Sequence, residues 1–548
     1  MKKVFCVMCW VLSVIMLASC SSSENPDKPN INNERPNGKE IVIYAGGSSE
    51  FSWIQGSEEQ EVLDYVENKY YEETGNSLKF KCVFLGQDLH SKLSSEIAAG
   101  SAVDIVISHT GGGVGVDDKL KSIKSHYDLS DIMFEQAPAL YDMVKGAPLD
   151  YLTTYNNDVI GIPSVINPYK FGILVRKDWM EACGYTDNEE KAKTEFADGK
   201  NYELVDNIET FEEMCLAIAR EYKKPYAVSG ATWDLEKVVT LGAYGDAGYF
   251  TKALVTQDGK ERIMDGGATD YYGDILALEY KWATNGVISK DANSILLEQA
   301  EAAFISGQTG IFVQDPTIQH LIKVSRATKL RNPEAEFTVL GPLKAKKDSP
   351  ADSRKGFMRN TQATFAAVIT AQSKVVDDIM SFMNWVYESE DNYNLCRYGI
   401  EGKHWINNGD GTYSYPEGKE KYITAPPYSG ILTLVENQRR SNLRYKGYTD
   451  EELRWIDDIA GNKDNYIKND IVDYVFMAND DYNKLHANAT VTLYNKIDSA
   501  WRGKTDPATF FKATAEAFNK SVERGRQSAR NWVNSVLNAV REHSPNVT

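Results

Sequence analysis

The stretch KLSSEIAAGSAVDIVI at residues 92–107 decides the fold class, because a helix pattern passes through a glycine turn directly into an apolar strand. The same alternation precedes it. An apolar run at residues 41–45 predicts a buried strand, apolar spacing over residues 62–70 predicts a helix, and alternation over residues 78–84 predicts a second strand. The order strand, helix, strand, helix, strand indicates a mostly parallel α/β sheet flanked by helices.

Polar residues follow two of these predicted strands. Ser48 and Ser49 come after the first strand, and His109 comes after the third. Ligands of open α/β sheets bind outside the carboxyl ends of the strands, so these three residues are candidates for ligand binding. Turn formation explains the same residues about equally well.

The length of 548 residues exceeds what one buried core usually supports, so at least two domains or lobes are expected. Further strand and helix patterns occur at residues 159–179, 302–313 and 362–370. Residues 453–540 are mostly helical in pattern, which predicts a helix-rich C-terminal part.

The composition excludes several classes of protein. Apolar residues make up 42% and charged residues 25%, which argues against a disordered chain and against a membrane bundle. The net charge of −18 argues against a general nucleic-acid binder, and we expect a monomer without a nucleic-acid partner. The 31 Tyr and 10 Trp either fill the core or line a pocket for rings, and for any single ring the core is the commoner place.

The first residues resemble a lipoprotein signal. Two lysines precede an apolar stretch at residues 4–17, which is too short for a comfortable membrane span, and Leu17-Ala18-Ser19-Cys20 resembles a bacterial lipobox. This resemblance implies that residues 1–19 are a signal peptide and that Cys20 carries diacylglycerol. The polar residues 20–39 then form a tether between the membrane and the folded body.

No metal or cofactor is expected. The cysteines outside the signal lie far apart, without the spacing of a zinc site or of a disulfide framework: Cys82, Cys183, Cys215 and Cys396. Residues 407–411 superficially resemble a calcium loop, but the Asp/Asn spacing and the distal Glu are absent. We interpret these residues as a glycine-rich hairpin turn.

Four segments, taken in order, resemble the extracellular solute-binding proteins of ABC importers, specifically the long lipoproteins related to those for sugars and oligosaccharides. They are the lipobox with its tether, residues 92–106, residues 169–180 with 210–214, and YGIEGKHW at residues 398–405.

The resemblance implies a type II periplasmic-binding-protein-like fold, with two lobes of mostly parallel sheet flanked by helices and a hinge between them. We expect residues 40–166 plus 311–365 in the N-terminal lobe and residues 167–310 plus 366–548 in the C-terminal lobe. The segments that cross between the lobes are expected near residues 167–171, 310–314 and 362–368.

The function implied is capture of a carbohydrate, most simply an oligosaccharide, in a cleft between the lobes. Delivery to an ABC-type permease would follow, on the extracellular or periplasmic side of the cell membrane. A binding protein of this kind is not an enzyme. The alternatives are a secreted glycoside hydrolase and a glycan-binding receptor without a transport role. No local motif in the sequence indicates the pair of carboxylates that a glycoside hydrolase needs.

A sugar site needs flat aromatic faces and hydrogen-bonding side chains. Glycine-rich surroundings favour Trp233 and Tyr244, and Trp405 closes the 398–405 segment together with Glu401 and His404. The alternative for each ring is packing against a neighbouring helix. Gln314 and Asp315 follow an apolar strand, and capping of the next helix explains Asp315 slightly better than ligand binding does.

Overall fold

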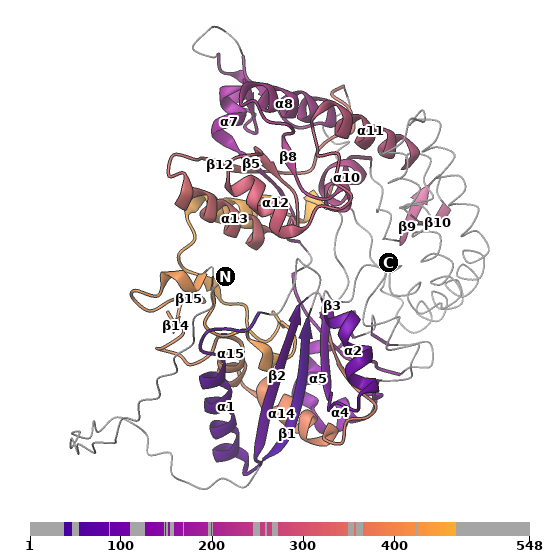
Figure 1. Cartoon of the computed structure of the whole chain (residues 1–548), viewed down its shortest axis with the longest axis vertical. Helices are drawn as coiled ribbons and strands as arrows, with labels where there is room; N and C mark the ends of the chain where they lie inside the picture. Colours follow the sequence, from indigo (N-terminus) through magenta and orange to yellow (C-terminus); the bar gives the residue numbers. More distant parts are fainter. Residues whose placement is uncertain are drawn as a thin grey trace, which may run out of the picture.

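Two sheets with separate hydrophobic cores organise the chain (Figure 1). The elements around the first sheet are called the N-terminal lobe and those around the second the C-terminal lobe. The computed structural model describes residues 38–46, 54–86, 88–109, 126–146, 148–149, 152–153, 158–167, 169–195, 199, 201–244, 252–257, 260–265, 272–348, 356–357, 365–423 and 425–466. The predicted signal, Cys20 and the part of the C-terminal helical pattern after residue 466 lie outside these residues. No helix in the described ranges combines the length and the apolar character that a membrane crossing needs.

The sheet of the N-terminal lobe has the order β2-β1-β3-β13-β4. The strands β1 (Lys39–Gly46), β2 (Leu78–Gly86) and β3 (Ile105–His109) run parallel, as the sequence predicts. The strand β13 (Phe365–Ile369) pairs antiparallel with β3 and with β4 (Ile162–Pro163).

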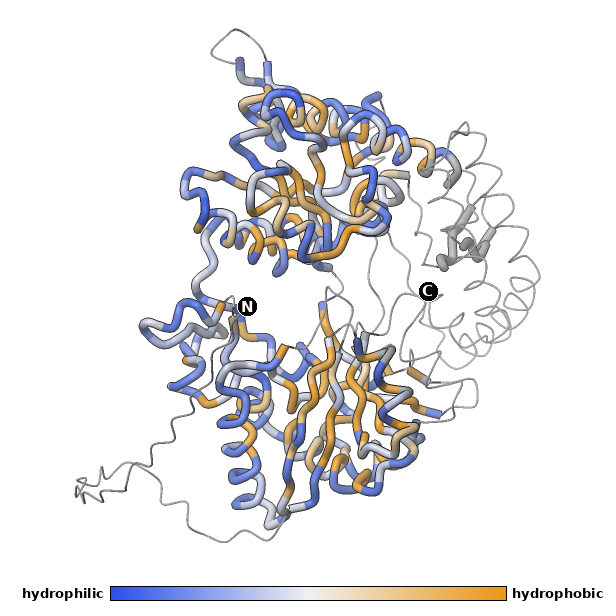
Figure 2. The backbone as a smooth tube through the Cα atoms, viewed as in Figure 1, coloured by the Kyte–Doolittle hydropathy of each residue, from blue (hydrophilic) through white to orange (hydrophobic). Residues whose placement is uncertain are grey.

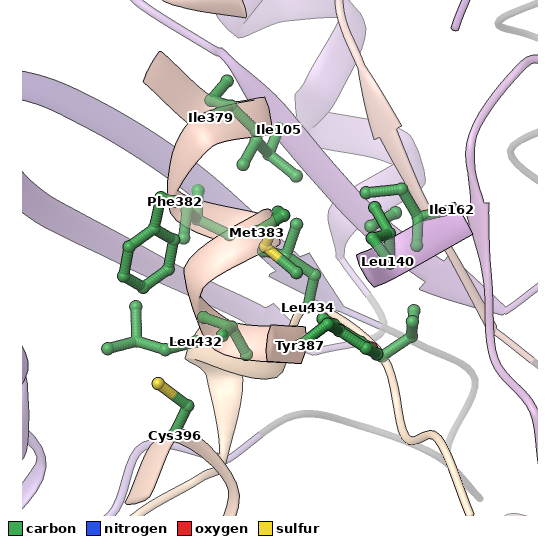
Figure 3. Close-up of a cluster of buried hydrophobic side chains, with 14 of the residues drawn as sticks. Ile105, Leu140, Ile162, Ile379, Phe382, Met383, Tyr387, Cys396, Leu432 and Leu434 are labelled. Carbon is green, nitrogen blue, oxygen red and sulfur yellow. The ribbon is translucent and has the colours of Figure 1, made fainter. Parts of the chain in front are cut away.

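Helices cover this sheet on both faces. Alternate residues of β1 point to opposite sides: Ile41 and Ile43 join the core beneath α1, whereas Val42 and Tyr44 pack with Leu89 of α2. Figure 2 shows hydrophobic residues concentrated along these strands, and Figure 3 shows β3 meeting α14 through side chains such as Ile105 and Met383. The helices of this lobe are α1 (Glu59–Thr74), α2 (Leu89–Ala98), α4 (Ile132–Gln136), α5 (Pro138–Val144), α14 (Val376–Glu388) and α15 (Glu390–Tyr398).

The sheet of the C-terminal lobe has the order β12-β5-β11-β8. The strand β11 (Ile311–Phe312) is parallel to β8 (Val228–Ser229) and antiparallel to β5 (Ile173–Arg176), which also pairs with β12 (Phe337–Leu340). The surrounding helices are α7 (Lys177–Ala182), α8 (Ile208–Glu221), α9 (Thr232–Leu235), a π-helix (Glu236–Thr240), α10 (Leu241–Tyr244), α11 (Tyr272–Asn285), α12 (Leu297–Ile305) and α13 (Ile318–Arg331).

The predicted lobe boundaries at residues 311 and 366 are wrong. The strand β11 pairs with β5 and β8, so residues 311–312 belong to the C-terminal lobe and the expected crossing at 310–314 does not occur. The strand β13 completes the N-terminal sheet, and α14 and α15 bury their apolar faces in that lobe's core. Two-residue strands such as β11 carry no local signal of which sheet they join.

Among the elements that the structure describes, the chain passes between the two lobes three times. Residues 165–171 form the first connection, because Val165 pairs with Asn437 of the N-terminal lobe and Phe171 pairs with Thr317 of the C-terminal lobe. A second lies between Phe357, which packs in the C-terminal core, and β13, and the residues 358–364 that join them lie outside the description. The third leads from Asn437 through β16 (Arg444–Tyr445) to α16 (Asp450–Arg454) and a π-helix (Trp455–Ala460).

A three-stranded sheet lies at the third connection. The strands β14 (Ile406–Asn407) and β15 (Thr412–Ser414) form an antiparallel hairpin, which confirms the predicted turn at residues 407–411, and β16 pairs parallel with β15. The remaining elements are β6 (Tyr185–Thr186), β7 (Glu203–Leu204), β9 (Lys252–Gln257), β10 (Lys260–Asp265) and the 3₁₀ turns Lys191–Lys193, Glu420–Ile423, Ile431–Thr433 and Lys463–Asn465.

Candidate functional site

The carboxyl ends of the parallel strands in the N-terminal lobe point toward the other lobe (Figure 1). Of the residues predicted there, Ser48 and Ser49 lie outside the described part of the chain. His109 ends β3, where its backbone pairs with Phe365, and its side chain is also outside the description. Their role in ligand binding stays a prediction.

In the C-terminal lobe, the carboxyl ends of β8 and β11 bring three predicted residues together. Trp233 follows β8 on α9, and Gln314 and Asp315 follow β11. The two strand ends approach closely at Gly230, where a Cβ atom would lie 2.5 Å from Val313 Cγ2 and 2.9 Å from the Gln314 nitrogen. Only glycine fits at that position, because its φ of 153° adds a backbone constraint to the steric one.

This edge lies beside the first connection between the lobes. The Gly172 N–H donates to the Pro316 carbonyl at 3.1 Å, and the Ile318 N–H donates to the Lys170 carbonyl at 2.7 Å. A ligand at the ends of β8 and β11 would therefore lie close to the junction of the lobes.

Gln314 and Asp315 are buried, with exposed fractions of 1% and 3%. The Gln314 Oε1 accepts a hydrogen bond from the Ala231 N–H, and the Asp315 N–H donates to Asp234 Oδ2 at 3.2 Å. Asp315 adopts a left-handed backbone with φ of 44°, which is unfavourable for a residue with a side chain. Helix capping, the alternative for Asp315, has no support, because α13 begins after Thr317 without a side-chain cap.

Charged side chains surround Asp315. Burial raises the pKa of Asp315, the nearby Asp234 raises it further, and His320, Lys170 and Lys237 oppose the shift. The Asp315 Oδ2 lies 3.5 Å from His320 Nδ1. Burial also lowers the pKa of Lys170, against the pull of Asp315 and Glu436. Glu436 belongs to the N-terminal lobe and Asp315 to the C-terminal lobe, so acidic groups of both lobes act on the pKa of Lys170.

Trp233 is half-buried and packs against the apolar cluster formed by α12, α13 and β12. Its neighbour Thr232 is tied to a different segment, since the Thr232 Oγ1 donates to Asn293 Oδ1 at 2.7 Å. Tyr244 ends α10, and its side chain lies outside the description. Trp233 is thus the one predicted ring whose side chain is described at this edge.

The residues Glu401, His404 and Trp405 form a separate group in the N-terminal lobe. Trp405 is 3% exposed, its indole N–H donates to the Gly399 carbonyl at 2.8 Å, and its ring packs on Tyr398. This is the packing that was its alternative to ligand contact. Glu401 is exposed, and His404 is buried with its Nδ1 accepting the Ile400 N–H at 2.9 Å.

One group of potential metal ligands occurs among the described residues: Glu58, Glu61 and His404. The ammonium group of Lys403 forms an ion pair with Glu61 and lies 3.8 Å from Glu58. Because a lysine already supplies positive charge to both carboxylates, this cluster is explained as an ion-pair network.

The buried His404 predicts a pH-dependent stability. Burial lowers its pKa below the ordinary value of 6.5, against the opposing charge of Glu58. Below about pH 6.5 the unfolded chain therefore binds a proton at this residue more readily than the folded chain does. The free energy of unfolding of the wild type should fall relative to that of His404→Gln as the pH drops through 6.5, measured by urea unfolding. Parallel pH curves for the two proteins would contradict this.

Sequence reasoning missed a tyrosine cluster at the third connection. Tyr413 and Tyr445 lie with ring centroids 5.5 Å apart, and Tyr448 continues the series toward the C-terminal lobe at 5.5 Å from Tyr445. Tyr398 and Tyr415 complete the cluster on the other side. The high tyrosine content was the only signal for it, because the rings come from a helix end, from two short strands and from residues beside them, which share no periodicity.

Comparison with known proteins identifies the fold. No protein-family model matches the sequence, and no curated protein matches it. Solved structures do match. A solute-binding protein associated with an ABC transporter from Bifidobacterium longum infantis, described as binding HMO, is 12% identical, with a TM-score of 0.64 over 91% of this chain and 99% of that one.

Two structures from Streptococcus pneumoniae are also similar. The N-glycan transport solute-binding protein in complex with Man5GlcNAc is 15% identical, with a TM-score of 0.56 over 91% of this chain and 99% of that one. The ABC-transporter substrate-binding protein in complex with kestose is 15% identical, with a TM-score of 0.60 over 91% of this chain and 100% of that one. These three structures are solute-binding proteins of transport systems, and the chain has their type II periplasmic-binding-protein fold.

Proposed function

We propose that this protein captures an oligosaccharide between its two lobes and delivers it to an ABC-type permease. The observation that carries the proposal is a fold shared with glycan-binding proteins, over nearly the whole of each chain, together with an aromatic ring at a strand-end edge beside the lobe junction. Hinge closure around a ligand turns binding into a change of shape that a permease can read.

The chemistry of this edge suits a sugar. Trp233 is half-buried, and an indole ring in such a position offers a flat surface that can cover the C–H face of a pyranose ring. The residues Ser48, Ser49, His109 and Tyr244 stay in the proposed site as predictions from the sequence.

Isothermal titration against a glycan panel tests the proposal, with kestose, Man5GlcNAc and human milk oligosaccharides as probes. Saturable binding without any change in the glycan supports it. Release of shorter products from the same mixtures would favour a glycoside hydrolase, and selective binding of a peptide or of a metal chelate would refute the sugar ligand while leaving the fold intact.

Trp233→Ala should weaken binding of the tightest panel glycan by about 1–3 kcal/mol, roughly 5- to 150-fold, because stacking of a ring on an aromatic face contributes that much. Titration of wild type and variant measures the effect. Trp179→Phe is the control, since Trp179 stacks on Tyr222 at 4.1 Å within the C-terminal lobe and should leave affinity unchanged. Unchanged affinity of the Trp233 variant would remove this ring from the site.

We also propose that Cys20 is lipidated after removal of residues 1–19, which would hold the protein on the outer side of the cell membrane. Labelling with a palmitate analogue should mark the wild type and leave Cys20→Ala unlabelled and released from the membrane fraction. Permease genes adjacent to this gene would support the importer over a glycan-binding receptor without a transport role.

A further inference from the structure

Hydrogen bonds join the short helix α9, which carries Trp233, to the residues that follow β11. They are made by residues before and after Trp233 in the sequence. Before the ring, the Ala231 N–H donates to Gln314 Oε1. After it, Asp234 Oδ2 accepts the Asp315 N–H at 3.2 Å. The other carboxylate oxygen of Asp234 accepts from Lys237 Nζ at 2.7 Å, one turn further along the same helical segment.

The side chains of Asp234, Gln314 and Asp315 are poorly placed to contact a ligand. The side chain of Asp234 is fully buried, and Gln314 and Asp315 are 1% and 3% exposed, whereas Trp233 between them is half-buried. Hydrogen bonds in such a buried setting fix geometry, because an unpaired polar group there is costly.

The backbone of Asp315 is part of the same arrangement. In the described part of the chain, positive φ angles occur at three non-glycine residues: Lys223, Asp315 and Leu434. The φ angle of Asp315 is 44°. This conformation accompanies the hydrogen bond from the Asp315 N–H to Asp234. Residues held in unfavourable backbone regions cluster at functional sites, where the surrounding structure maintains them.

We infer that the side chains of Asp234 and Gln314, together with the backbone N–H of Asp315, hold the Trp233 ring ready for a sugar, and that none of these groups contacts the ligand. The inference rests on the proposed function, and it changes the role predicted for Gln314 and Asp315 from the sequence. A ring held in place before binding loses less freedom when the ligand arrives, which favours affinity.

A double-mutant cycle with Trp233→Ala and Asp234→Asn tests the inference, using whichever of kestose, Man5GlcNAc or human milk oligosaccharides binds most tightly. Asp234→Asn alone should weaken binding about fivefold. In the Trp233→Ala background the same substitution should cost less than twofold, because there is no ring left to position. Equal losses in both backgrounds, or no loss in either, would overturn the inference.

Asp315→Gly separates the backbone from the carboxylate. Glycine accepts a φ of 44° and keeps the N–H that donates to Asp234, so affinity should stay within about twofold of the wild type. A tenfold loss in a variant with wild-type thermal unfolding would mean that the carboxylate contacts the ligand. Asp206→Asn is the matched control, because Asp206 pairs with Lys344 at 2.8 Å in the same lobe and should leave affinity unchanged.

A measurement without ligand keeps this inference separate from the proposed function. The emission of Trp233 is obtained by subtracting the spectrum of Trp233→Phe from that of the wild type, and the same subtraction is made in the Asp234→Asn background. We expect the Trp233 emission to shift to longer wavelength and to become more accessible to acrylamide in that background. An unchanged emission would refute positioning, whereas failure of every glycan to bind would refute only the proposed function.

Discussion

Replacing Trp282 by alanine should lower the free energy of unfolding by about 3–5 kcal/mol, the usual cost of removing a large buried ring. Trp282 on α11 is fully buried, its ring centroid lies 6.0 Å from that of Phe211, and its indole N–H donates to Glu212 Oε2 at 2.9 Å. The variant loses the contacts of the ring and one hydrogen bond to the carboxylate. Denaturant unfolding of the C-terminal lobe, followed by circular dichroism, measures the effect.

Two further variants calibrate this result. Trp282→Phe keeps an apolar ring and should lie between the wild type and the alanine variant. Leu330→Ala removes an apolar side chain that is 83% exposed and should change stability by less than about 0.5 kcal/mol. An unfolding midpoint for Trp282→Ala equal to that of the wild type would contradict the core described around α8 and α11.

Replacing Arg326 by alanine is the second change with a large expected effect, about 2–4 kcal/mol of stability. Both oxygens of Glu452 accept hydrogen bonds from the Arg326 guanidinium at 2.6 Å, and Arg326 also donates to the Gly447 carbonyl at 2.8 Å. The side chains are 23% and 7% exposed, so water screens the pair only in part and removal of Arg326 leaves a buried carboxylate without its partner.

A neighbouring ion pair provides the control for Arg326. Arg444 pairs with Asp457 at 2.7 Å, but these side chains are 45% and 50% exposed, so Arg444→Ala should cost less than about 1 kcal/mol. Because Arg326 also lies over the rings of Tyr445 and Tyr448, its loss should loosen the third connection between the lobes. Equal stabilities for the two variants would show that the Arg326 network does not fasten this connection.

The sequence predicted the elements of the first sheet well, because their signals are local. Residues 41–45, 78–84 and 105–107 alternate or run apolar as strands do, and β1, β2 and β3 contain them. The choice of partner strand is not local. Residues 311–312 and 365–369 are both short apolar strands, and only the three-dimensional pairing shows that they belong to opposite lobes.

The site was partly predictable for the same reason. Glycine-rich surroundings selected Trp233, and a position directly after an apolar strand selected Gln314 and Asp315. The structure brings the three residues together. Neither signal revealed the role of Asp234, because only the three-dimensional structure shows that its carboxylate accepts the N–H of Asp315, which lies 81 residues away in the sequence. The motif that ends at Trp405 resembled a family signature, but a signature does not separate a ring that packs internally from one that meets a ligand.

The position of β13 in the sheet has a consequence for the order in which the two sheets are completed during synthesis. Between β3 and β4 the first sheet lacks a strand until the ribosome has passed residue 369, whereas all four strands of the second sheet lie between residues 173 and 340. Contacts between segments distant in the chain form slowly. The second sheet can therefore be completed during synthesis before the first, in which β3 pairs with a strand made more than 250 residues later.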